Sequence, residues 1–398
     1  AFEKLPVIVC RGATPGEVGR SHGEQLRERI AATLGFYFGL LQELGLSMEQ
    51  VSAWGTRARG EVGGFAPELT EEICGIAEGA GRASWELFAL NSRSELLAFA
   101  LGRRSPPAEC TAVYCAASAC LAQNWDWDAR IDRLPVLLQI PRRGNTPQIL
   151  TMTEPGMVAK IGFNDCGVGV CLNILAGPPV STEPHGLPVH CLLRLALSAP
   201  SLRAAEALLK AAPRHCSSHI LLADAVGQFR LLEFAGRDLE RAAADPLASN
   251  VSDESPIEGA EWQVMPPTVV AHTNHYLHPR FAHFTSRLAH TEERYERVMR
   301  IAEDHDAAVD EEATEGGRRR RGAGADDELR LVKRILGDRE GAPKSILYDD
   351  AAGISPEAPV ATVCSIVMEL RALRMHITRG SAMEQNYVQV PLLHMSSL

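Results

Sequence analysis

The spacing of apolar residues predicts that the first hundred residues are mostly helical. A short strand, LPVIVC, leads into a helical stretch over residues 15–44, for which Thr14 and Pro15 resemble a capped start. In the segment ELTEEICGIAEGAG the apolar side chains recur at helical spacing and define one buried face. Further helical runs are predicted to begin near residues 48, 67 and 84.

At residue 103 the pattern changes. The segment RRSPPAE is charged and rich in proline, which ends the preceding helix and favours an extended, accessible backbone. Mostly apolar strands separated by short turns are predicted next: CTAVYCAA, ACLAQNWDW, LPVLLQI, QILTMT, AKIGFN and VGVCLNIL. Apolar strands of this kind indicate sheets that are covered on at least one face.

The rest of the chain mixes helices and strands. Helices are predicted for PVHCLLRLAL and SLRAAEALLKAA, and for residues 291–303 and 327–336. Strands are predicted for HILLADAVGQFRLLEF, which turns at residues 225–227, for TVVAHTNHYL, and for a late hairpin of VATVCSIVMEL with ALRMHITRG. This order fits an α+β fold in which two sheets pack together with helices outside, although periodicity alone does not separate it from other α+β architectures.

One segment has no apolar periodicity. Residues 304–328, DHDAAVDEEATEGGRRRRGAGADDE, combine acidic residues, arginines and glycines, and we expect a disordered surface insertion. The four arginines at 318–321 could bind an anion. A solvated loop is the simpler interpretation.

Composition narrows the class of protein. The chain has 398 residues, 45% of them hydrophobic, and a formal net charge of −10, so nucleic acid is not an expected partner. No apolar run approaches the roughly 18–20 residues that span a bilayer, and the first ten residues lack the features of a secretory signal. We therefore expect neither a nucleic-acid partner nor a membrane partner.

The ten cysteines favour an intracellular enzyme. Most of them lie inside apolar runs such as VGVCLNIL, as reduced core thiols do, and neither CxxC nor HExxH occurs. We expect no metal and no cofactor. The C-terminal Ser-Ser-Leu is only faintly similar to a peroxisomal signal, so a cytoplasmic location is expected and a peroxisomal one stays open.

Cys110 stands where the proline-rich linker meets the predicted hairpin. Read on its own, a cysteine at the start of a strand is more often structural than nucleophilic, and the residues around it change that judgement. The segments that matter are Cys110-Thr111 with Tyr114-Cys115, then QNWD at 123–126, LNSRSE at 90–95, GFNDCGVGVCLNIL at 162–175, AHTNHYL at 271–277 and TVCSIVMEL at 362–370.

In their order along the chain and at these spacings, the segments resemble the isopenicillin N acyltransferase family (acyl-CoA:6-aminopenicillanic acid acyltransferases). This family also includes insect N-β-alanyl-dopamine hydrolases. The resemblance runs from about residue 12 to about residue 390, apart from the charged insertion. It implies the N-terminal-nucleophile fold, a four-layer αββα sandwich. It also implies a precursor that cleaves itself between Glu109 and Cys110. Residues 1–109 would then be a helical α-subunit and residues 110–398 a catalytic β-subunit, joined as a heterodimer.

The chemistry implied by the resemblance uses few residues. Cleavage leaves Cys110 with a free α-amine, whose reference pKa of about 7.7–8.0 allows it to take the thiol proton. By resemblance Asp126 orients this amine, and Asn274 donates a hydrogen bond to the oxyanion. Tyr114, Ser217 and His275 are further site candidates with weaker support.

Two departures from the family pattern matter. Glu109 stands where relatives commonly have Gly or Asp, and a bulkier residue there can slow cleavage. The family's late catalytic arginine has no clear counterpart on the approach to residues 360–370.

The hypothesis is an acyltransferase or amidohydrolase that moves an acyl group from an amide or an acyl-CoA to Cys110, and then to an amine or to water. Two alternatives stay open. One is an uncleaved binding or scaffold protein of the same fold. The other is a conventional cysteine hydrolase with a Cys-His dyad, such as Cys216 with His215 or His219.

Overall fold

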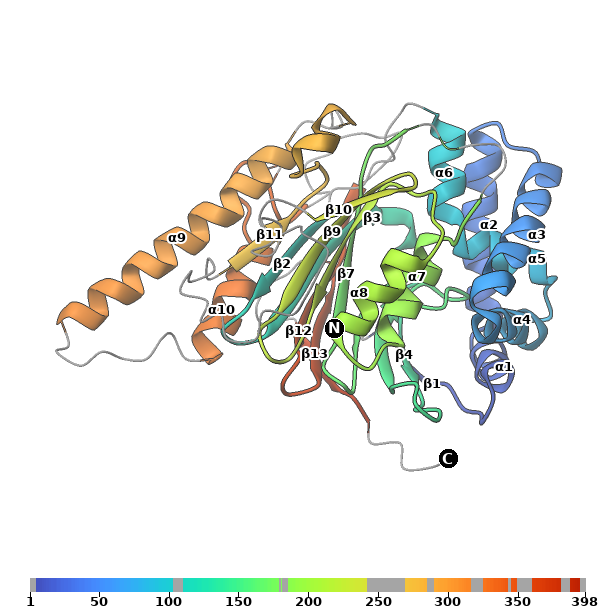
Figure 1. The fold of residues 1–398 in the computed structure, drawn as a ribbon, viewed down its shortest axis with the longest axis horizontal. Helices are drawn as coiled ribbons and strands as arrows, with labels where there is room; N and C mark the ends of the chain where they lie inside the picture. The colour runs from blue at the N-terminus through green and yellow to red at the C-terminus, as the bar shows by residue number, and fades with distance from the viewer. Residues whose placement is uncertain are drawn as a thin grey trace.

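The computed structural model describes residues 5–102, 110–178, 180, 185–241, 269–284, 290–315, 325–342, 345–348, 360–380 and 387–393 (Figure 1). The predicted α+β class is confirmed, because helices enclose two packed sheets. The proline-rich segment and the cleavage-site residue Glu109 at its end lie outside the described residues.

The helical first part is built as expected, with one break. Its elements are β1 (Val7–Val9), α1 (Pro15–Gln25), α2 (Arg27–Glu43), α3 (Met48–Phe65), α4 (Pro67–Ala80), α5 (Ser84–Asn91) and α6 (Arg93–Leu101). Thr14 caps α1, since its hydroxyl accepts a hydrogen bond from the Glu17 amide at 3.2 Å while the Glu17 carboxylate accepts one from the Thr14 amide. The helical stretch predicted over residues 15–44 is confirmed but consists of two helices, because the backbone of Leu26 (φ −117°, ψ 16°) separates α1 from α2.

Glycines set the contact between α1 and α4. A Cβ atom on Gly19 would lie 1.9 Å from the carbonyl oxygen of Glu72, and one on Gly75 would lie 2.1 Å from that of Gly16. The two helix backbones therefore touch, and only residues without a side chain allow this approach.

Two sheets form the centre of the molecule. The eight-stranded sheet has the order β1-β4-β5-β6-β7-β8-β9-β10, and the six-stranded sheet has the order β11-β2-β3-β12-β13-β14. The strands of the first sheet after β1 are β4 (Val136–Ile140), β5 (Ile149–Thr153), β6 (Ile161–Asn164), β7 (Gly169–Ile174), β8 (Ser218–Ala223), β9 (Phe229–Ala235) and β10 (Asp238–Arg241). Those of the second are β11 (Val269–His272), β2 (Thr111–Cys115), β3 (Cys120–Asp128), β12 (Val360–Glu369), β13 (Arg374–Arg379) and β14 (Val388–Pro391).

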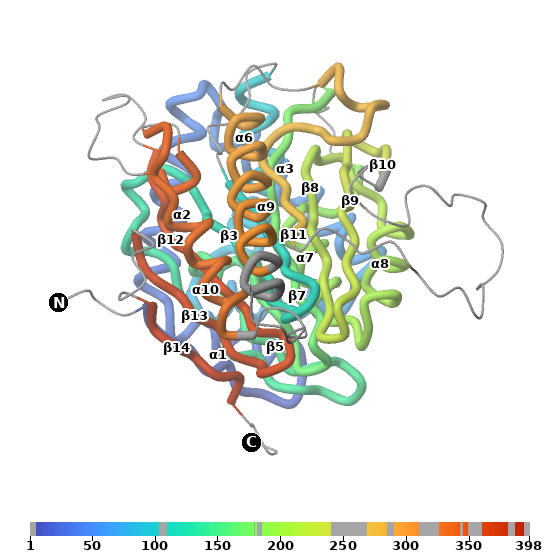
Figure 2. The backbone as a smooth tube through the Cα atoms, turned by 90° about the vertical axis from the view of Figure 1, so that its left-hand side faces the viewer, coloured from blue at the N-terminus to red at the C-terminus, as the bar shows by residue number. Residues whose placement is uncertain are grey.

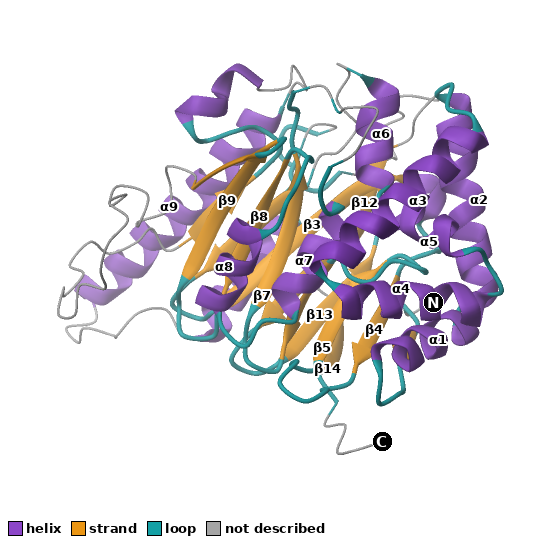
Figure 3. Ribbon diagram, turned by 45° about the vertical axis from the view of Figure 1, so that its right-hand side comes forward, coloured by secondary structure: helices purple, strands orange, loops and turns teal. Residues whose placement is uncertain are grey.

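Helices cover both outer faces, so the expected four-layer αββα arrangement is present. α7 (Val189–Leu197) and α8 (Leu202–Ala211) pack on the eight-stranded sheet, and the N-terminal helices lie beside α7 (Figure 3). α9 (Thr291–Glu315) and α10 (Ala325–Leu336) pack on β11, β2 and β3 of the other sheet and face the viewer in Figure 2. Inner faces of both sheets meet where β7 contacts β2 and β3.

The predicted disordered insertion over residues 304–328 is largely wrong. α9 continues to Glu315 and α10 begins at Ala325, and residues 316–324 lie outside the described residues. Alanine and glutamate are strong helix formers, so the acidic half of this segment extends a helix although it has no regular apolar face.

All ten cysteines are free, as predicted, and all except Cys74 and Cys166 are buried. Within the described ranges, no group of histidine, cysteine and acidic side chains is arranged to hold a metal ion. No helix in that part of the chain is long and apolar enough to cross a membrane.

A buried charge cluster joins the N-terminal helices to the sheets. Glu154, which follows β5, accepts hydrogen bonds from Arg93 of α6 at 2.8 Å, from Lys160 at 3.1 Å and from the hydroxyl of Tyr37 of α2. Burial alone would raise the pKa of Glu154, but Arg93 and Lys160 outweigh it and lower that pKa to about 2. The carboxylate is therefore ionised, and it fixes two elements of the N-terminal part against the β5–β6 loop.

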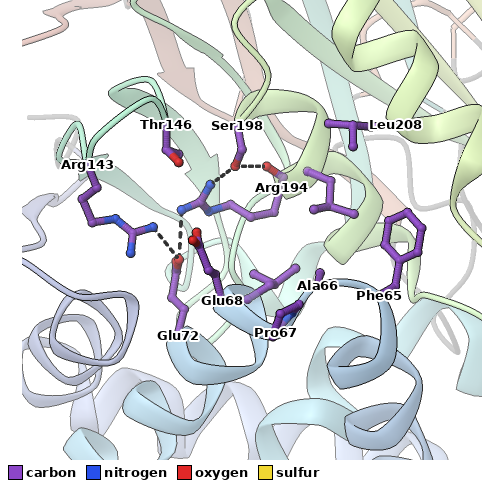
Figure 4. Close-up of a pocket in the computed structure, with 12 residues that line it drawn as sticks. Phe65, Ala66, Pro67, Glu68, Glu72, Arg143, Thr146, Arg194, Ser198 and Leu208 are labelled. Atoms are coloured by element: carbon purple, nitrogen blue, oxygen red, sulfur yellow. Dashed lines mark hydrogen bonds and ion pairs between the residues drawn. The ribbon is translucent and has the colours of Figure 1, made fainter.

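A second cluster lines a cavity of about 300 Å³ between the same two parts of the molecule (Figure 4). Glu72 of α4 accepts a hydrogen bond from Arg194 of α7 at 2.9 Å and lies 3.8 Å from Arg143. Arg194 also donates to the hydroxyl of Ser198. Both clusters are thus ion pairs between the first hundred residues and the sheet-bearing remainder.

Replacing Glu154 by Gln should destabilise the protein strongly. The substitution keeps the shape but leaves the Arg93 cation buried without an anion, and removing one partner of a buried ion pair typically costs about 3–5 kcal/mol. Urea denaturation followed by circular dichroism would measure the loss. Glu78→Gln is the matched control: its partner Arg20 and Glu78 itself are exposed, so the midpoint should hardly move. Equal shifts for both variants would contradict the expectation.

Candidate active site

Cys110 lies at the edge of the sandwich where β2 begins. Thr111 is paired with Asn124 of β3, so Cys110 stands beside Trp125 across the hairpin. The thiol is buried, with Sγ 3.9 Å from the carbonyl oxygen of Asp126. Asp126 therefore lies on the strand paired with β2, close to Cys110.

Asp126 is held rigidly. Its Oδ1 accepts a 2.6 Å hydrogen bond from the hydroxyl of Thr362, the residue paired with it on β12. The same hydroxyl accepts a hydrogen bond from the Tyr348 amide at 2.9 Å. A buried carboxylate in this position places a fixed negative charge beside the start of β2.

The charges around Cys110 act against one another. Burial and the negative charge of Asp126 raise the pKa of the Cys110 thiol to about 11, while the cations of Lys160 and Arg294 oppose the rise. Lys160 lies over the ring of Trp125, with Nζ 3.0 Å from the ring centroid. With the peptide bond before Cys110 intact, the thiol is therefore protonated at neutral pH and is a weak nucleophile.

Asn274 follows β11 and is almost fully buried. Its Nδ2 donates to the carbonyl oxygen of Ile174 at 2.9 Å, and its backbone amide donates to the hydroxyl of Thr291 at 2.7 Å. Its Oδ1 accepts a hydrogen bond from Nη2 of Arg294 at 3.0 Å. Since β11 pairs with β2, this amide lies near the start of the strand that carries Cys110.

Arg294 of α9 connects the parts of the site, and the sequence interpretation missed it. Besides Asn274, it donates through Nη1 to the carbonyl oxygen of Cys110 at 3.0 Å and to the hydroxyl of Thr111 at 2.8 Å. A signal was present in the sequence: Arg294 is in helical register with Val298 and Ile301, which are both buried. An arginine on the buried face of a helix indicates that its guanidinium has a specific hydrogen-bond partner inside the protein.

Asn173 of β7 is a second residue to which no role was assigned. Its Nδ2 donates to the carbonyl oxygens of Cys110 at 3.0 Å and of His272 at 3.3 Å. Its Oδ1 accepts a hydrogen bond from Nδ1 of His219 at 3.0 Å. The carbonyl of Cys110 is thus held by Asn173 of the eight-stranded sheet and by Arg294 of α9.

Histidines support the loop that carries Asn274. His272 bonds to Glu233 at 2.8 Å and stacks on His219 with ring centroids 3.5 Å apart. Glu233 also accepts hydrogen bonds from the amides of Leu277 and His278, so its carboxylate shapes the loop after β11. Burial opposes ionisation of Glu233, but these bonds, foremost that from His272, lower its pKa below the ordinary value.

The weaker site candidates lie in different places. His275 is near the site, because its Nδ1 lies within 3.1 Å of the hydroxyls of Thr273 and Thr291, and burial lowers its pKa to about 4. Ser217, directly before the start of β8, accepts a hydrogen bond from the Gly236 amide at 3.2 Å. Tyr114 donates to the carbonyl oxygen of Asp224 at 2.8 Å and makes no hydrogen bond to Cys110, Asp126 or Asn274 in the described structure.

The residues of the alternative Cys-His dyad are not arranged as a dyad. The sulfur of Cys216 lies 3.8 Å from the hydroxyl of Ser218, and burial raises its pKa far above the ordinary value. His219 points Nδ1 at Asn173. In the described part of the chain neither His215 nor His219 hydrogen-bonds to this sulfur.

The site places a buried cysteine thiol close to the acidic residue Asp126, and the side-chain amide of Asn274 lies just after the neighbouring strand β11. Residues 115–317 match the family model described as acyl-coenzyme A:6-aminopenicillanic acid acyl-transferase, and this match covers more than half of the chain. The chain belongs to this family.

A curated relative agrees with this assignment. The chain is 34% identical over 254 residues to the acyl-coenzyme A:6-aminopenicillanic-acid-acyltransferase 40 kDa form of Emericella nidulans. The aligned part covers 60% of this chain and 66% of that protein, slightly less than two thirds of its length.

Solved structures share lower similarity. A point mutant of conjugated bile acid hydrolase from Clostridium perfringens has a TM-score of 0.41 and 12% identity, covering 72% of this chain and 92% of that one. Penicillin V acylase from Agrobacterium tumefaciens has a TM-score of 0.38 and 13% identity, covering 68% of this chain and 82% of that one. The family assignment is made on the sequence match.

In the intact chain, Cys110 should resist alkylation. At pH 7.5 its buried, protonated thiol should react with iodoacetamide more slowly than the exposed Cys166. The measurement is peptide mapping by mass spectrometry after brief exposure, on full-length chain separated from any cleaved material by gel electrophoresis. Cys110 labelled as fast as Cys166 would contradict the burial and charge described above.

Proposed function

We propose that the protein is a self-cleaving cysteine acyltransferase or amidohydrolase in which Cys110 becomes the N-terminal residue. One observation carries the proposal: Cys110 stands between a proline-rich linker and the first residue of β2, and Asp126, Asn274 and Arg294 converge on that position. Membership of the acyltransferase family supports it, and the matched residues include Asn274.

The first step is an acyl shift within the chain. The sulfur of Cys110 attacks the carbonyl carbon of Glu109, the peptide C–N bond breaks, and the thiol proton ends on the nitrogen that becomes the α-amine. Water then opens the thioester, which leaves Glu109 as a C-terminal carboxylate and restores the thiol. The products are residues 1–109 and residues 110–398.

In the second stage the new α-amine replaces the missing base. With a reference pKa of about 7.7–8.0, it accepts the thiol proton near neutral pH, and the carboxylate of Asp126 orients it. The sulfur attacks the acyl carbonyl of an amide or an acyl-CoA, the leaving amine or CoA thiol takes a proton, and an S-acyl intermediate forms. An amine or water then takes the acyl group and regenerates Cys110.

Asn274 would stabilise the tetrahedral intermediates that form when Cys110 is acylated and when the S-acyl group is transferred to an amine or to water. Its Nδ2 carries two N–H groups, of which one bonds to Ile174 and the second is the donor assigned to the oxyanion. Acyl transfer by this route needs no metal or cofactor, and its partners are a small amide or amine and an acyl donor such as acyl-CoA. We place the enzyme in the cytoplasm or the peroxisome, which the placement of its cysteines favours.

The two fragments should remain together as a heterodimer. The clusters at Glu154 and Glu72 bridge residues on either side of the proposed cut. Separating the fragments would part Arg93 from Glu154 and Arg194 from Glu72, and breaking a buried ion pair is costly.

The decisive test is the covalent state of the purified protein. SDS gel electrophoresis and intact mass should give fragments matching residues 1–109 and 110–398, with Cys110 as the new N-terminus by sequencing. Cys110→Ala should stay intact and inactive, whereas Cys110→Ser can still process slowly. A wild-type chain that stays intact would favour a binding or scaffold role, and activity in Cys110→Ala would favour another nucleophile.

Replacing Asn274 by Ala should lower kcat by about 10²–10³, because it removes one donor to the oxyanion. Steady-state kinetics of processed protein against short N-acyl amines and acyl-CoAs would measure the change. Asn145→Ala, at an exposed turn between β4 and β5, is the matched control and should keep full activity. Loss of less than about threefold for Asn274→Ala would rule out this role.

A further inference from the structure

Arg294 is a buried cation that binds three oxygens of the candidate site. Its guanidinium donates to the Cys110 carbonyl, to the Thr111 hydroxyl and to Oδ1 of Asn274, at 2.8–3.0 Å. Only 2% of the residue is exposed. Burial of a charged side chain is unfavourable on its own. A buried arginine is therefore expected where its hydrogen bonds hold neighbouring groups in a defined position.

The first turns of α9 hold Asn274 at two points. Thr291, the first residue of the helix, accepts a hydrogen bond from the Asn274 backbone amide at 2.7 Å. Arg294, three residues later, lies on the same face of the helix and holds the side-chain oxygen of Asn274. Backbone and side chain of this residue are thereby fixed to one rigid element.

The contact with Arg294 also decides which way the amide of Asn274 points. An asparagine side chain can exchange its oxygen and nitrogen by a half-turn about the last bond. A guanidinium has only donors, so it accepts nothing and must face the oxygen. Nδ2 is then directed to the other side, where it meets the carbonyl oxygen of Ile174.

The same guanidinium holds the nucleophile. Nη1 binds the carbonyl oxygen of Cys110, which Asn173 binds from the opposite sheet. The backbone of Cys110 and the side chain of Asn274 are therefore hydrogen-bonded to the same planar guanidinium, which fixes their relative position. A displacement of about 1 Å between reacting groups can cost about 10²-fold in rate, so fixing this position has a large effect on catalysis.

We propose that Arg294 is a positioning residue that sets the amide orientation of Asn274 and its distance from Cys110. This role rests on the proposed function, in which Asn274 donates to the oxyanion. Arg294 does not touch the reacting atoms; it acts through Asn274 and through the backbone carbonyl of Cys110. Its substitution should then cost more while the Asn274 amide is present than in its absence, where only the contacts with Cys110 and Thr111 are lost.

A double-mutant cycle tests this dependence. The variants are Arg294→Met, Asn274→Ala and the double substitution, and the probe is p-nitrophenyl acetate, whose acyl transfer to Cys110 releases coloured p-nitrophenolate. We expect Arg294→Met to lower kcat at least tenfold with little change in KM in the wild-type background. In the Asn274→Ala background the same change should cost at least about threefold less, because only the contacts with Cys110 and Thr111 are then lost.

Two further variants keep the test interpretable if Arg294→Met is unstable. Arg294→Lys preserves the charge but cannot bridge two partners as a planar fork, so it should lose kcat while its melting temperature stays close to wild type. Arg297→Met, one turn along α9, removes an arginine paired with Asp338 and Glu340 and should leave kcat unchanged.

The results separate two failures. Equal fold losses for Arg294→Met in both backgrounds, or unchanged kcat in Arg294→Lys, would overturn the positioning role. Absence of p-nitrophenolate release that depends on Cys110 in the wild type would instead overturn the proposed function. In that case, the positioning contact is judged by melting temperatures: strictly additive losses for Arg294→Met and Asn274→Ala would refute it.

Discussion

The pairing of β11, β2, β3 and β12 as consecutive neighbours is the constraint on which the candidate site depends. Each of these strands contributes one functional position at the same edge: Asn274 after β11, Cys110 at the start of β2, Asp126 on β3 and Thr362 on β12. Antiparallel register fixes which residues stand opposite one another, as in the pair of Thr362 and Asp126. A slip of one residue would turn these side chains to the other face.

Such a site places charges between two packed sheets, where each needs a partner. Glu154, Lys160 and Arg93 satisfy one another on the side of the eight-stranded sheet, and Arg294 donates to oxygens of the site on the other. The LNSRSE segment explains how the N-terminal helices take part: Asn91 bonds to Gly156 and Val158, and Glu95 bonds to the Val189 amide. The LNSRSE segment therefore holds the N-terminal helices against the sheet-bearing part of the molecule.

Local sequence patterns were sufficient for most of the fold. Apolar runs bounded by turns predicted the strands, and Thr14 with Pro15 predicted the start of α1. These local patterns failed where the structure depends on contacts between residues that are distant in sequence. The break at Leu26 and the helical extension of α9 to Glu315 lack an apolar signal, and no local rule ties Arg294 to Cys110, 184 residues away in sequence. The family resemblance predicted Asp126 and Asn274 as site residues. Arg294 and Asn173 are identified only by their hydrogen bonds in the folded protein.

The protonated thiol of the intact chain explains why exposure of the α-amine would change its chemistry. Before cleavage, burial and Asp126 raise the pKa of Cys110 to about 11, and the cations nearby do not compensate. Asp126 is unfavourable to a thiolate but favourable to an ammonium group. Once the α-amine exists, the same carboxylate would stabilise its protonated form, and that cation would in turn favour the thiolate. One buried acid would thus keep the thiol protonated in the intact chain and favour the thiolate once the α-amine is free, without any rearrangement of the sheet.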